Sequence, residues 1–219
     1  DPALNGVTFE CEPREIVAVT GPNGAGKTTV ANLASGLFKP QMGSVLLDGV
    51  EIRQFDAIDI RQTIGLVPQI SEMLYGTVSQ NLRLSVPFAT DEEIIEAAKT
   101  ADIDYAIMKL PDGYETRLTE RVVSELPEGF KQKLAIARAL LRKPPILIFD
   151  EPGQMLYERG DNAFLEAVKK LRGSCTIVII THRPSHMRAA DRLIVLNEGR
   201  LQFNGDPEEA LKQMQGGGQ

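Results

Sequence analysis

Apolar residues follow two alternating patterns along much of the chain. Short runs rich in β-branched residues are each followed by a stretch in which apolar residues recur every three or four positions. The first pattern indicates buried strands and the second indicates amphipathic helices. Their alternation predicts an α/β core on a mostly parallel sheet that is covered on both faces. The predicted strand and helix pairs are 15–21 with 26–38, 144–150 with 162–173, and 175–182 with 185–193.

Two other patterns interrupt this core. Residues 1–20 and 43–53 alternate apolar and polar positions between turn signals, which predicts an antiparallel sheet at one edge. Residues 77–110 have helical periodicity, and the sequences "TVSQ" and "TDEE" within them are capping boxes. We therefore expect a helical subdomain inserted into the core.

These patterns together predict a single domain over residues 1–219, a length that can bury an ordinary core. The core and the antiparallel β subdomain are expected at about 1–70 and 141–219, and the helical subdomain at about 71–140. The sequence "DPEE" predicts the start of the last helix, with Asp206 as N-cap and Pro207 in the first helical position.

Charge and composition exclude several classes of protein. The 24 Lys and Arg residues are interspersed with 30 Asp and Glu residues and form no basic block, which argues against a dedicated nucleic-acid-binding protein. No apolar run approaches the ~18–20 residues of a membrane span, and the N-terminus lacks the pattern of a signal peptide. Cys11 and Cys175 lie far apart without metal-ligand spacing, so we expect two buried free thiols in a reducing cytosol.

The sequence "GPNGAGKT" at 21–28 matches the phosphate-binding loop (P-loop) pattern, with a predicted strand before it and a predicted helix after it. Glycines let backbone N–H groups curl around phosphates, Lys27 can reach the β and γ oxygens, and the Thr28 hydroxyl can ligate Mg²⁺. The alternative, a plain glycine-rich turn, is disfavoured by the flanking pattern. The motif predicts a P-loop NTPase core. Its expected nucleotide contacts are Gly21, Pro22, Asn23, Gly24, Ala25, Gly26, Lys27, Thr28 and Thr29.

Further polar residues stand at predicted strand ends, where open α/β sheets bind ligands. Asp150 is expected to hold Mg²⁺ through water, and Glu151 to act as the general base on the attacking water. Gln69 ends "GLVPQ" and can reach a metal or a water, while His182 ends "VIITH" and can hydrogen-bond the γ-phosphate. Taken alone, each could simply be a polar residue at a strand end. His186 is interpreted as a structural hydrogen-bonding residue.

The order of these elements resembles the nucleotide-binding domain of ATP-binding cassette (ABC) transporters over essentially the whole chain. The run "KLAIARALLRKPPILIFDEP" at 133–152 is similar to the family's most recognisable segment, and "THRPS" to its switch histidine segment. The phrases "DIRQTIGLVPQ" and "YGTVSQNL" are similar to the exporter branch. The resemblance implies ATP as the nucleotide, Mg²⁺ on Thr28, Gln69 and Asp150, and catalytic roles for Lys27, Glu151 and His182.

The resemblance also implies partners. Two nucleotide-binding domains would pair head to tail, each covering the other's ATP with its signature helix, and would drive transmembrane domains that precede this segment in the same polypeptide. The expected location is the cytoplasmic face of a membrane, with the segment near Glu120 touching the membrane domains. The family carries an adenine-stacking aromatic before "ALNGVTF", and none precedes Phe9, so either the polypeptide extends upstream of Asp1 or adenine binding is weakened.

The signature segment departs from the family's Leu-Ser-Gly-Gly-Gln. Pro127 lacks the serine hydroxyl and an N–H group, Glu128 brings a negative charge toward a γ-phosphate, and Phe130 cannot make the polar contacts of glutamine. Like charges within ~4 Å repel by about 4 kcal/mol at an effective dielectric constant near 20. The five aligned, partner-facing positions are Leu126, Pro127, Glu128, Gly129 and Phe130.

A second departure follows Glu151, where the family's Ser-Ala-Leu-Asp stretch keeps only Leu156 and has Tyr157 in place of the aspartate. Both departures fall on surfaces that a partner would face, while the chain's own P-loop and strand-end residues are intact. The leading hypothesis is therefore an ATP-hydrolysing motor domain of a heteromeric exporter, paired with a different chain and having one degenerate site.

Three alternatives stay open at this point. One is an ATP-dependent regulatory or interaction module with little or no turnover. Another is a small-molecule kinase or a GTPase, which the absence of an Asn-Lys-x-Asp motif and the run at 133–152 disfavour. The third is a soluble cassette protein of DNA repair or translation, which neither a long coiled-coil insertion nor a basic face supports.

Overall fold

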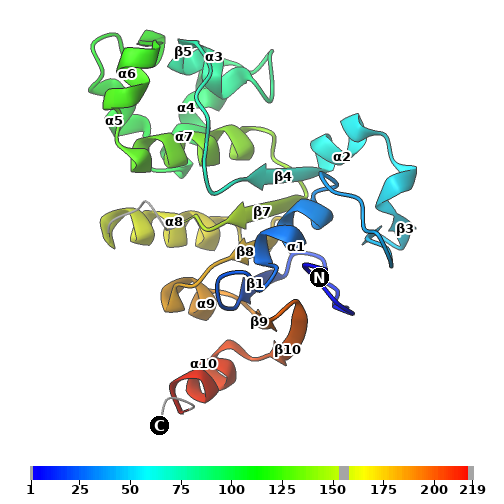
Figure 1. The fold of residues 1–219 in the computed structure, drawn as a ribbon. Coiled ribbons are helices and arrows are strands. Elements are labelled where there is room, and N and C mark those ends of the chain that lie inside the picture. Colours follow the sequence, from blue (N-terminus) through cyan, green and yellow to red (C-terminus); the bar gives the residue numbers. More distant parts are fainter. Residues whose placement is uncertain (1, 153–157, 217–219) are drawn as a thin grey trace. The chain divides into compact units, whose positions relative to one another are not determined.

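The computed structural model describes residues 2–152 and 158–216, which form two compact units (Figure 1). The first unit contains the chain up to Leu66, the segment Pro145–Glu151 and the chain from Leu171 onward. The second contains Val67–Pro144, Pro152 and the described part of a helix that reaches Lys170. Most of helix α8 (Glu158–Leu171) therefore belongs to the second unit, although the sequence patterns assigned residues 141–219 to the core.

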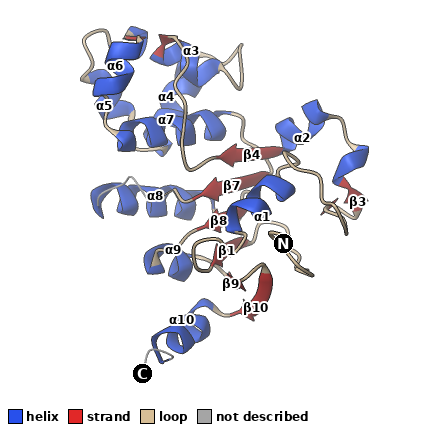
Figure 2. Cartoon of the chain, in the orientation of Figure 1, coloured by secondary structure: helices blue, strands red, loops and turns tan. Residues whose placement is uncertain are grey.

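The first unit is built on a sheet of six strands among the described residues, shown in red in Figure 2. Its order is β10-β9-β1-β8-β7-β4. Strand β1 pairs in parallel with both β8 and β9, and β7 pairs in parallel with β8, so the predicted parallel core is confirmed. The strand bounds are β1 Ile16–Thr20, β4 Ile64–Val67, β7 Ile146–Asp150, β8 Thr176–Ile180, β9 Arg192–Asn197 and β10 Arg200–Gly205.

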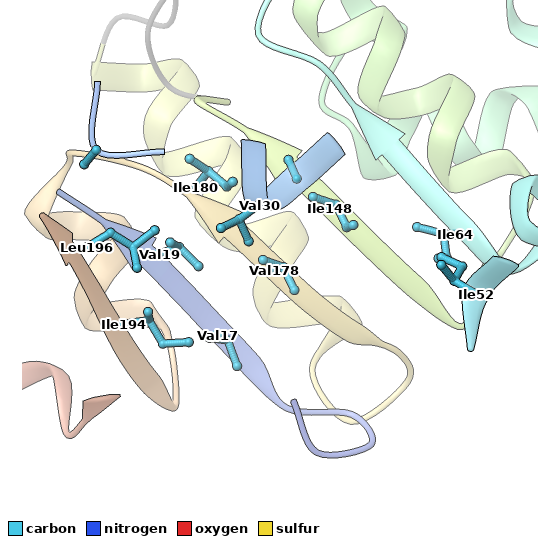
Figure 3. Packing of buried hydrophobic residues seen from close by; sticks show 12 residues of the cluster. Val17, Val19, Val30, Ile52, Ile64, Ile148, Val178, Ile180, Ile194 and Leu196 are labelled. Atoms are coloured by element: carbon cyan, nitrogen blue, oxygen red, sulfur yellow. The ribbon is translucent and has the colours of Figure 1, made fainter. Parts of the chain in front are cut away.

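Buried aliphatic side chains join this sheet to helix α1 (Lys27–Ala34). Figure 3 shows Val30 of α1 above Val19, Ile180 and Val178 of the neighbouring strands. All five residues of β1 are buried, because alternate side chains enter the apolar layers on the two faces of the sheet. This packing holds the start of α1 against the carboxyl ends of the central strands.

The other elements of the first unit are short. The described part holds the 3-10 helix η1 Ile52–Gln54 and helices α2 Ala57–Thr63, α9 Pro184–Ala189 and α10 Pro207–Gly216. Helix α9 is shorter than the predicted 185–193, because Arg192 and Leu193 already pair with Val17 and Ala18 in the sheet. Helix α10 begins as predicted, with the Asp206 carboxylate accepting from the backbone N–H groups of Glu208 and Glu209 at 2.9 and 3.0 Å.

The antiparallel strands are present, but their membership differs from the prediction. Strands β2 (Leu46–Leu47) and β3 (Val50–Glu51) pair with each other, and β10 pairs antiparallel with β9. The expectation that residues 1–20 would join this antiparallel sheet is wrong. Residues 2–15 contain no strand, and β1 lies in the middle of the parallel sheet. A turn at 12–15, closed by the Glu15 N–H donating to the Glu12 carbonyl, ends the alternating stretch before β1.

Helices dominate the second unit, as expected for residues 77–110. Its described elements are β5 Gly76–Thr77, α3 Val78–Arg83, α4 Asp91–Thr100, α5 Asp104–Met108, η2 Gly113–Glu115, β6 Arg117–Leu118, α6 Glu120–Glu125, α7 Glu128–Leu141 and α8 Glu158–Leu171. Both predicted capping boxes form. The hydroxyls of Thr77 and Thr90 accept from the backbone N–H groups of Gln80 and Glu93, whose side chains accept from the backbone N–H groups of those threonines.

Helix α7 is fixed inside the second unit by a partly buried polar contact with α3 and the residues that follow it. The Arg138 guanidinium donates to the backbone carbonyl of Asn81 at 2.9 Å, and the Ser85 hydroxyl donates to the Arg138 carbonyl at 2.8 Å. Burial lowers the pKa of Arg138 from its ordinary value. Since a guanidinium that is partly removed from water is costly unless it is hydrogen-bonded, this contact helps to fix the position of α7 along α3.

The two cysteines are free thiols, as expected. Cys175 is buried, whereas Cys11 is only partly buried, so the prediction of two buried thiols is wrong for Cys11. Removal of its thiol from water raises the pKa of Cys11 to about 11, with a smaller contribution from the negative charge of Glu15. Neither thiol is in a setting that favours the thiolate.

An ion pair connects the segment before β1 to β9. The Arg192 guanidinium donates to both carboxylate oxygens of Glu15, at 2.7 and 2.9 Å, and also to the Glu10 carbonyl. The two side chains are 21% and 14% exposed, so solvent screens the pair only partly. The bonds from Arg192 hold the pKa of Glu15 below its ordinary value of 4.5.

Replacing Arg192 with methionine is expected to lower the free energy of unfolding at pH 7 by about 1–3 kcal/mol. Glu15 then keeps its burial and the hydrogen bond from the Glu12 N–H, but loses both bonds from the guanidinium. A depressed carboxyl pKa stabilises the fold above the unfolded-state pKa, and this contribution disappears as the pH falls through the folded-state pKa. The difference between wild type and Arg192→Met should therefore shrink below about pH 4.5 in urea titrations.

The matched control is Arg188→Met, which breaks a 3.5 Å contact with Glu208 between side chains that are 49% and 61% exposed. That change should cost at most about 1 kcal/mol. Equal losses in the two variants would contradict the stabilising role of the pair between Arg192 and Glu15.

Candidate functional site

The predicted P-loop lies between β1 and α1, and its shape depends on backbone conformations that favour glycine. Gly21, Gly24 and Gly26 have positive φ angles of 148°, 82° and 97°. Gly26 is the N-cap of α1 and provides no side chain to cap it. The first N–H groups of α1 are therefore left without a side-chain cap, at the helix end where the dipole favours an anion.

Lys27 is the first residue of α1, and its ammonium group lies over the loop itself. Its Nζ atom donates to the carbonyl oxygens of Gly21 and Pro22 at 2.8 and 3.0 Å, and the residue is only 9% exposed. A buried positive charge and uncapped N–H groups together form a site for a polyphosphate.

Thr28 and Asp150 place two oxygen ligands beside this loop. The Thr28 hydroxyl donates to the Asp150 carboxylate at 3.4 Å, and Asp150 is 5% exposed at the end of β7. Burial raises the pKa of Asp150, the Thr28 hydrogen bond opposes this, and the nearby Glu151 carboxylate adds to the rise. Within the described residues no group of three His, Cys, Asp or Glu side chains could hold a metal alone.

These donors fit Mg²⁺, which is usually held by one or two protein oxygens, several waters and the phosphate oxygens of a nucleotide. A divalent cation beside Asp150 would also oppose the cost of burying its carboxylate.

Glu151 and His182 meet at the carboxyl ends of β7 and β8. The Nδ1 atom of His182 lies 2.8 Å from the Glu151 carboxylate. An ionised carboxylate can only accept, so His182 Nδ1 donates in this contact. Glu151 has a positive φ of 49°, a conformation uncommon for glutamate, and its backbone N–H donates to the carbonyl of Ile180. The imidazole is 56% exposed and the carboxylate only 12%, so the histidine is the member of the pair open to solvent.

The structure therefore brings together, in one unit, the loop residues 21–29 with Asp150, Glu151 and His182. Gln69 lies two residues after β4 and belongs to the second unit, as do all five signature positions.

Among the signature positions, Pro127 and Glu128 are exposed, and Leu126 and Gly129 are half-buried. Phe130 is buried at 9% exposure, so its ring packs inside the second unit rather than on its surface. The Glu128 carboxylate accepts from the Lys131 ammonium at 2.6 Å. Leu156 and Tyr157, on which the second sequence departure rests, lie outside the described residues.

Thr181 carries no motif of its own, yet it supports this strand end. It is 1% exposed, its hydroxyl accepts from the backbone N–H of Arg183 at 3.0 Å, and His186 lies 3.1 Å from the same hydroxyl. The signal in the sequence is a threonine directly after an apolar strand pattern and three residues before Pro184, between two elements, where hydroxyls commonly bond nearby backbone groups.

A P-loop between the first strand and first helix of a parallel sheet, with carboxylates at the end of a neighbouring strand, defines the class of P-loop nucleoside triphosphatases. The family model described as "ABC transporter" matches residues 4–154. The chain belongs to the ABC transporter family, whose ATP-binding domains are ATPases coupled to transport.

Individual relatives agree with this assignment. The chain is 37% identical over 213 residues to the ABC transporter ATM1 of Toxoplasma gondii, covering 97% of this chain and 19% of that protein. It is 39% identical over 212 residues to the ATP-dependent lipid A-core flippase of Chromobacterium violaceum, covering 97% and 36%. A solved structure of a bacterial Atm1-family ABC exporter with ATP bound superposes with a TM-score of 0.91, at 36% identity and with 96% and 37% covered.

The chain thus spans between about a fifth and two fifths of the length of these relatives. These relatives are named as an ABC transporter, a flippase and an ABC exporter, and the chain corresponds to their nucleotide-binding part. No helix among the described residues is both long enough and apolar enough to cross a bilayer.

Proposed function

We propose that the chain is the ATP-hydrolysing motor domain of an ABC exporter, on the cytoplasmic face of a membrane, and that ATP-driven dimer closure is coupled to transmembrane domains. The observation that carries the proposal is the convergence of Lys27, the pair of Thr28 and Asp150, and the pair of Glu151 and His182 in one unit. A phosphate-binding group, a metal-binding pair and a base are the components that phosphoryl transfer to water requires.

In this proposal each residue has a distinct task. The N–H groups of the loop and Lys27 bind the β- and γ-phosphates. Thr28 and Asp150 would hold Mg²⁺, which supplies charge neutralisation at the phosphate oxygens. Glu151 accepts a proton from the water whose oxygen bonds to the γ-phosphorus, as the bond from that phosphorus to the bridging oxygen of ADP breaks. His182 orients Glu151 and contacts the γ-phosphate.

The helical subdomain has a separate task in the proposed dimer. It presents the start of α7 to the partner's ATP, while the segment near Glu120 faces the membrane domains. We propose that the domain organisation follows this division, with the core at about 1–70 and 141–219 and the helical subdomain at about 71–140.

The start of α7 also supports a degenerate second site. Pro127 is the N-cap of α7 and provides no side-chain hydrogen bond to it. Glu128 occupies the first helical position and is exposed. The carboxylate is paired with Lys131, but its side chain remains 56% exposed. A helix end that carries its own anion is a poor site for a second one. We therefore propose a heteromer of two different chains. The partner's signature covers the ATP bound to this chain's P-loop well, whereas this chain's signature covers the partner's ATP poorly.

Replacing Pro127 with serine and Glu128 with glycine is expected to raise ATP-dependent self-association by about tenfold. The change removes a negative charge whose repulsion of the partner's ATP costs about 1–2 kcal/mol, and it adds a hydroxyl donor. Phe130 is left unchanged because its ring is buried. The measurement is sedimentation of the Glu151→Gln background with and without ATP and Mg²⁺, since that background is expected to bind ATP without hydrolysing it.

The control is Glu125→Gln, which removes another exposed negative charge just before α7. It should leave the association unchanged. Equal gains in both variants would indicate a general charge effect and would contradict the degenerate signature. Robust ATP turnover by the unaltered chain that rises steeply with its own concentration would likewise contradict the heteromer, since self-pairing should give two poorly covered sites.

A further inference from the structure

We propose that His186 is a positioning residue for His182, acting through the hydroxyl of Thr181. This inference rests on the proposed role of His182 at the ATP site. It concerns a fully buried histidine whose ring is in hydrogen-bond contact with the Thr181 hydroxyl.

The first step is the attachment of the strand end. The backbone N–H of Thr181 donates to the Val19 carbonyl of β1 at 3.0 Å, so the residue before His182 is fixed to the central sheet. The residue after His182 is fixed as well, because the N–H of Arg183 donates to the Thr181 hydroxyl at 3.0 Å. The backbone on both sides of His182 therefore depends on Thr181.

The second step is the orientation of that hydroxyl. A threonine hydroxyl has one proton to donate and can rotate about its bond to Cβ. The Nδ1 atom of His186 lies 3.1 Å from Thr181 Oγ1, and the two residues are 0% and 1% exposed. With the hydroxyl proton directed at Nδ1, an oxygen lone pair is left facing the Arg183 N–H. Water cannot replace the imidazole at this depth, so His186 fixes the rotamer of Thr181.

The third step is the dependence of His182 on its backbone. Its imidazole is 56% exposed, and its Nδ1 atom lies 2.8 Å from the Glu151 carboxylate. The bond to Glu151 selects one of the rotamers open to this exposed ring, and that bond can form only when the backbone places the His182 Cβ within reach. Small displacements of a catalytic group can lower the rate by large factors.

The proposal distinguishes removal of the hydrogen bond from removal of bulk. His186→Leu and Thr181→Val keep the approximate volume and remove one partner each. His186→Asn and Thr181→Ser keep an acceptor or a hydroxyl at the corresponding atom and serve as matched controls. Thermal unfolding of all four identifies any variant that fails to fold.

The first measurement is independent of ATP hydrolysis. Selectively labelled chain should show a nuclear Overhauser effect between the His182 ring proton Hε1 and the side-chain protons of Glu151, because Nδ1 and the carboxylate are in contact. We expect this signal in the wild type and in both controls, and its loss in His186→Leu and Thr181→Val. A retained signal in those two variants, when folded, would overturn the proposal.

The second measurement is single-turnover hydrolysis of bound ATP at high chain concentration. His186→Leu and Thr181→Val should lower the rate by about tenfold or more while the affinity for ATP stays within about twofold. In a His182→Ala background the same changes should have no further effect. Losses of the same size in that background would overturn the proposal, because they would show that His186 acts elsewhere. A different result would separate the two proposals. If His186→Leu and Thr181→Val lose the Overhauser signal but keep the wild-type rate, and His182→Ala also keeps that rate, the positioning of His182 would stand and its proposed role in hydrolysis would be contradicted.

Discussion

The change Glu151→Gln is expected to lower ATP hydrolysis by about 10²–10³-fold, with the affinity for ATP nearly unchanged. The amide is isosteric with the carboxylate but cannot accept the proton of the attacking water at neutral pH. It can still accept from His182 Nδ1, so the arrangement at the ends of β7 and β8 is preserved. The measurement is the rate of phosphate release together with equilibrium binding of a fluorescent ATP analogue.

Glu92→Gln, an exposed carboxylate on α4 of the second unit, is the control and should change neither quantity. A Glu151→Gln chain that hydrolyses ATP as fast as wild type would contradict the motor proposal. Low turnover in the wild type that Glu151→Gln does not reduce further would instead support an ATP-dependent regulatory module, the alternative that the sequence left open.

Replacing Gly21 with alanine is expected to weaken ATP binding by at least tenfold and to lower the free energy of unfolding by about 2 kcal/mol or more. A Cβ atom at this position would lie 2.1 Å from the carbonyl oxygen of Leu196 and 3.2 Å from Ala25 Cβ. That carbonyl belongs to β9, where Leu196 pairs with Leu201, so it cannot move without disturbing the sheet. The φ angle of 148° is also unfavourable for alanine. Calorimetric titration with ATP and urea unfolding would measure the two effects.

Gly24→Ala provides the matched control within the same loop. Gly24 also has a positive φ, but an added Cβ would meet no atom within 4 Å. Only the backbone conformation is then penalised, by about 1–2 kcal/mol, and ATP binding should be affected much less than in Gly21→Ala. Similar effects of the two substitutions would show that the contact with Leu196 does not determine the shape of the loop.

Local chemistry explains which parts of the fold could be predicted from the sequence. The strands at 15–21, 144–150 and 175–182 are recognisable because both faces of a central parallel strand are buried and must be apolar. The capping boxes at Thr77 and Thr90 are equally local, since their hydrogen bonds join residues only three positions apart. The P-loop is a contiguous motif, and so its position and its role could be stated before the structure.

Errors arose where pairing partners are distant in the sequence. Residues 2–15 alternate apolar and polar positions as a strand does, but this alternation does not show whether another strand has a free edge with which they can pair. Arg192 and Leu193 continue a helical pattern in the sequence, yet in the structure they belong to β9 because they pair with β1. The burial of Phe130 was also not predicted. The sequence places this residue in the first turn of the helix but does not show whether its side chain faces the interior or the solvent.

Residue type and short spacing were enough to predict the class of protein and the P-loop. They were also enough to single out the strand-end residues Asp150, Glu151 and His182 and the departures at Pro127 and Glu128. The contact between Glu151 and His182, and the one between buried His186 and the Thr181 hydroxyl, became known from the three-dimensional structure. These contacts join residues on different strands or across a turn. Their distances depend on strand register and on packing around β1 and β8, which side-chain periodicity alone does not encode.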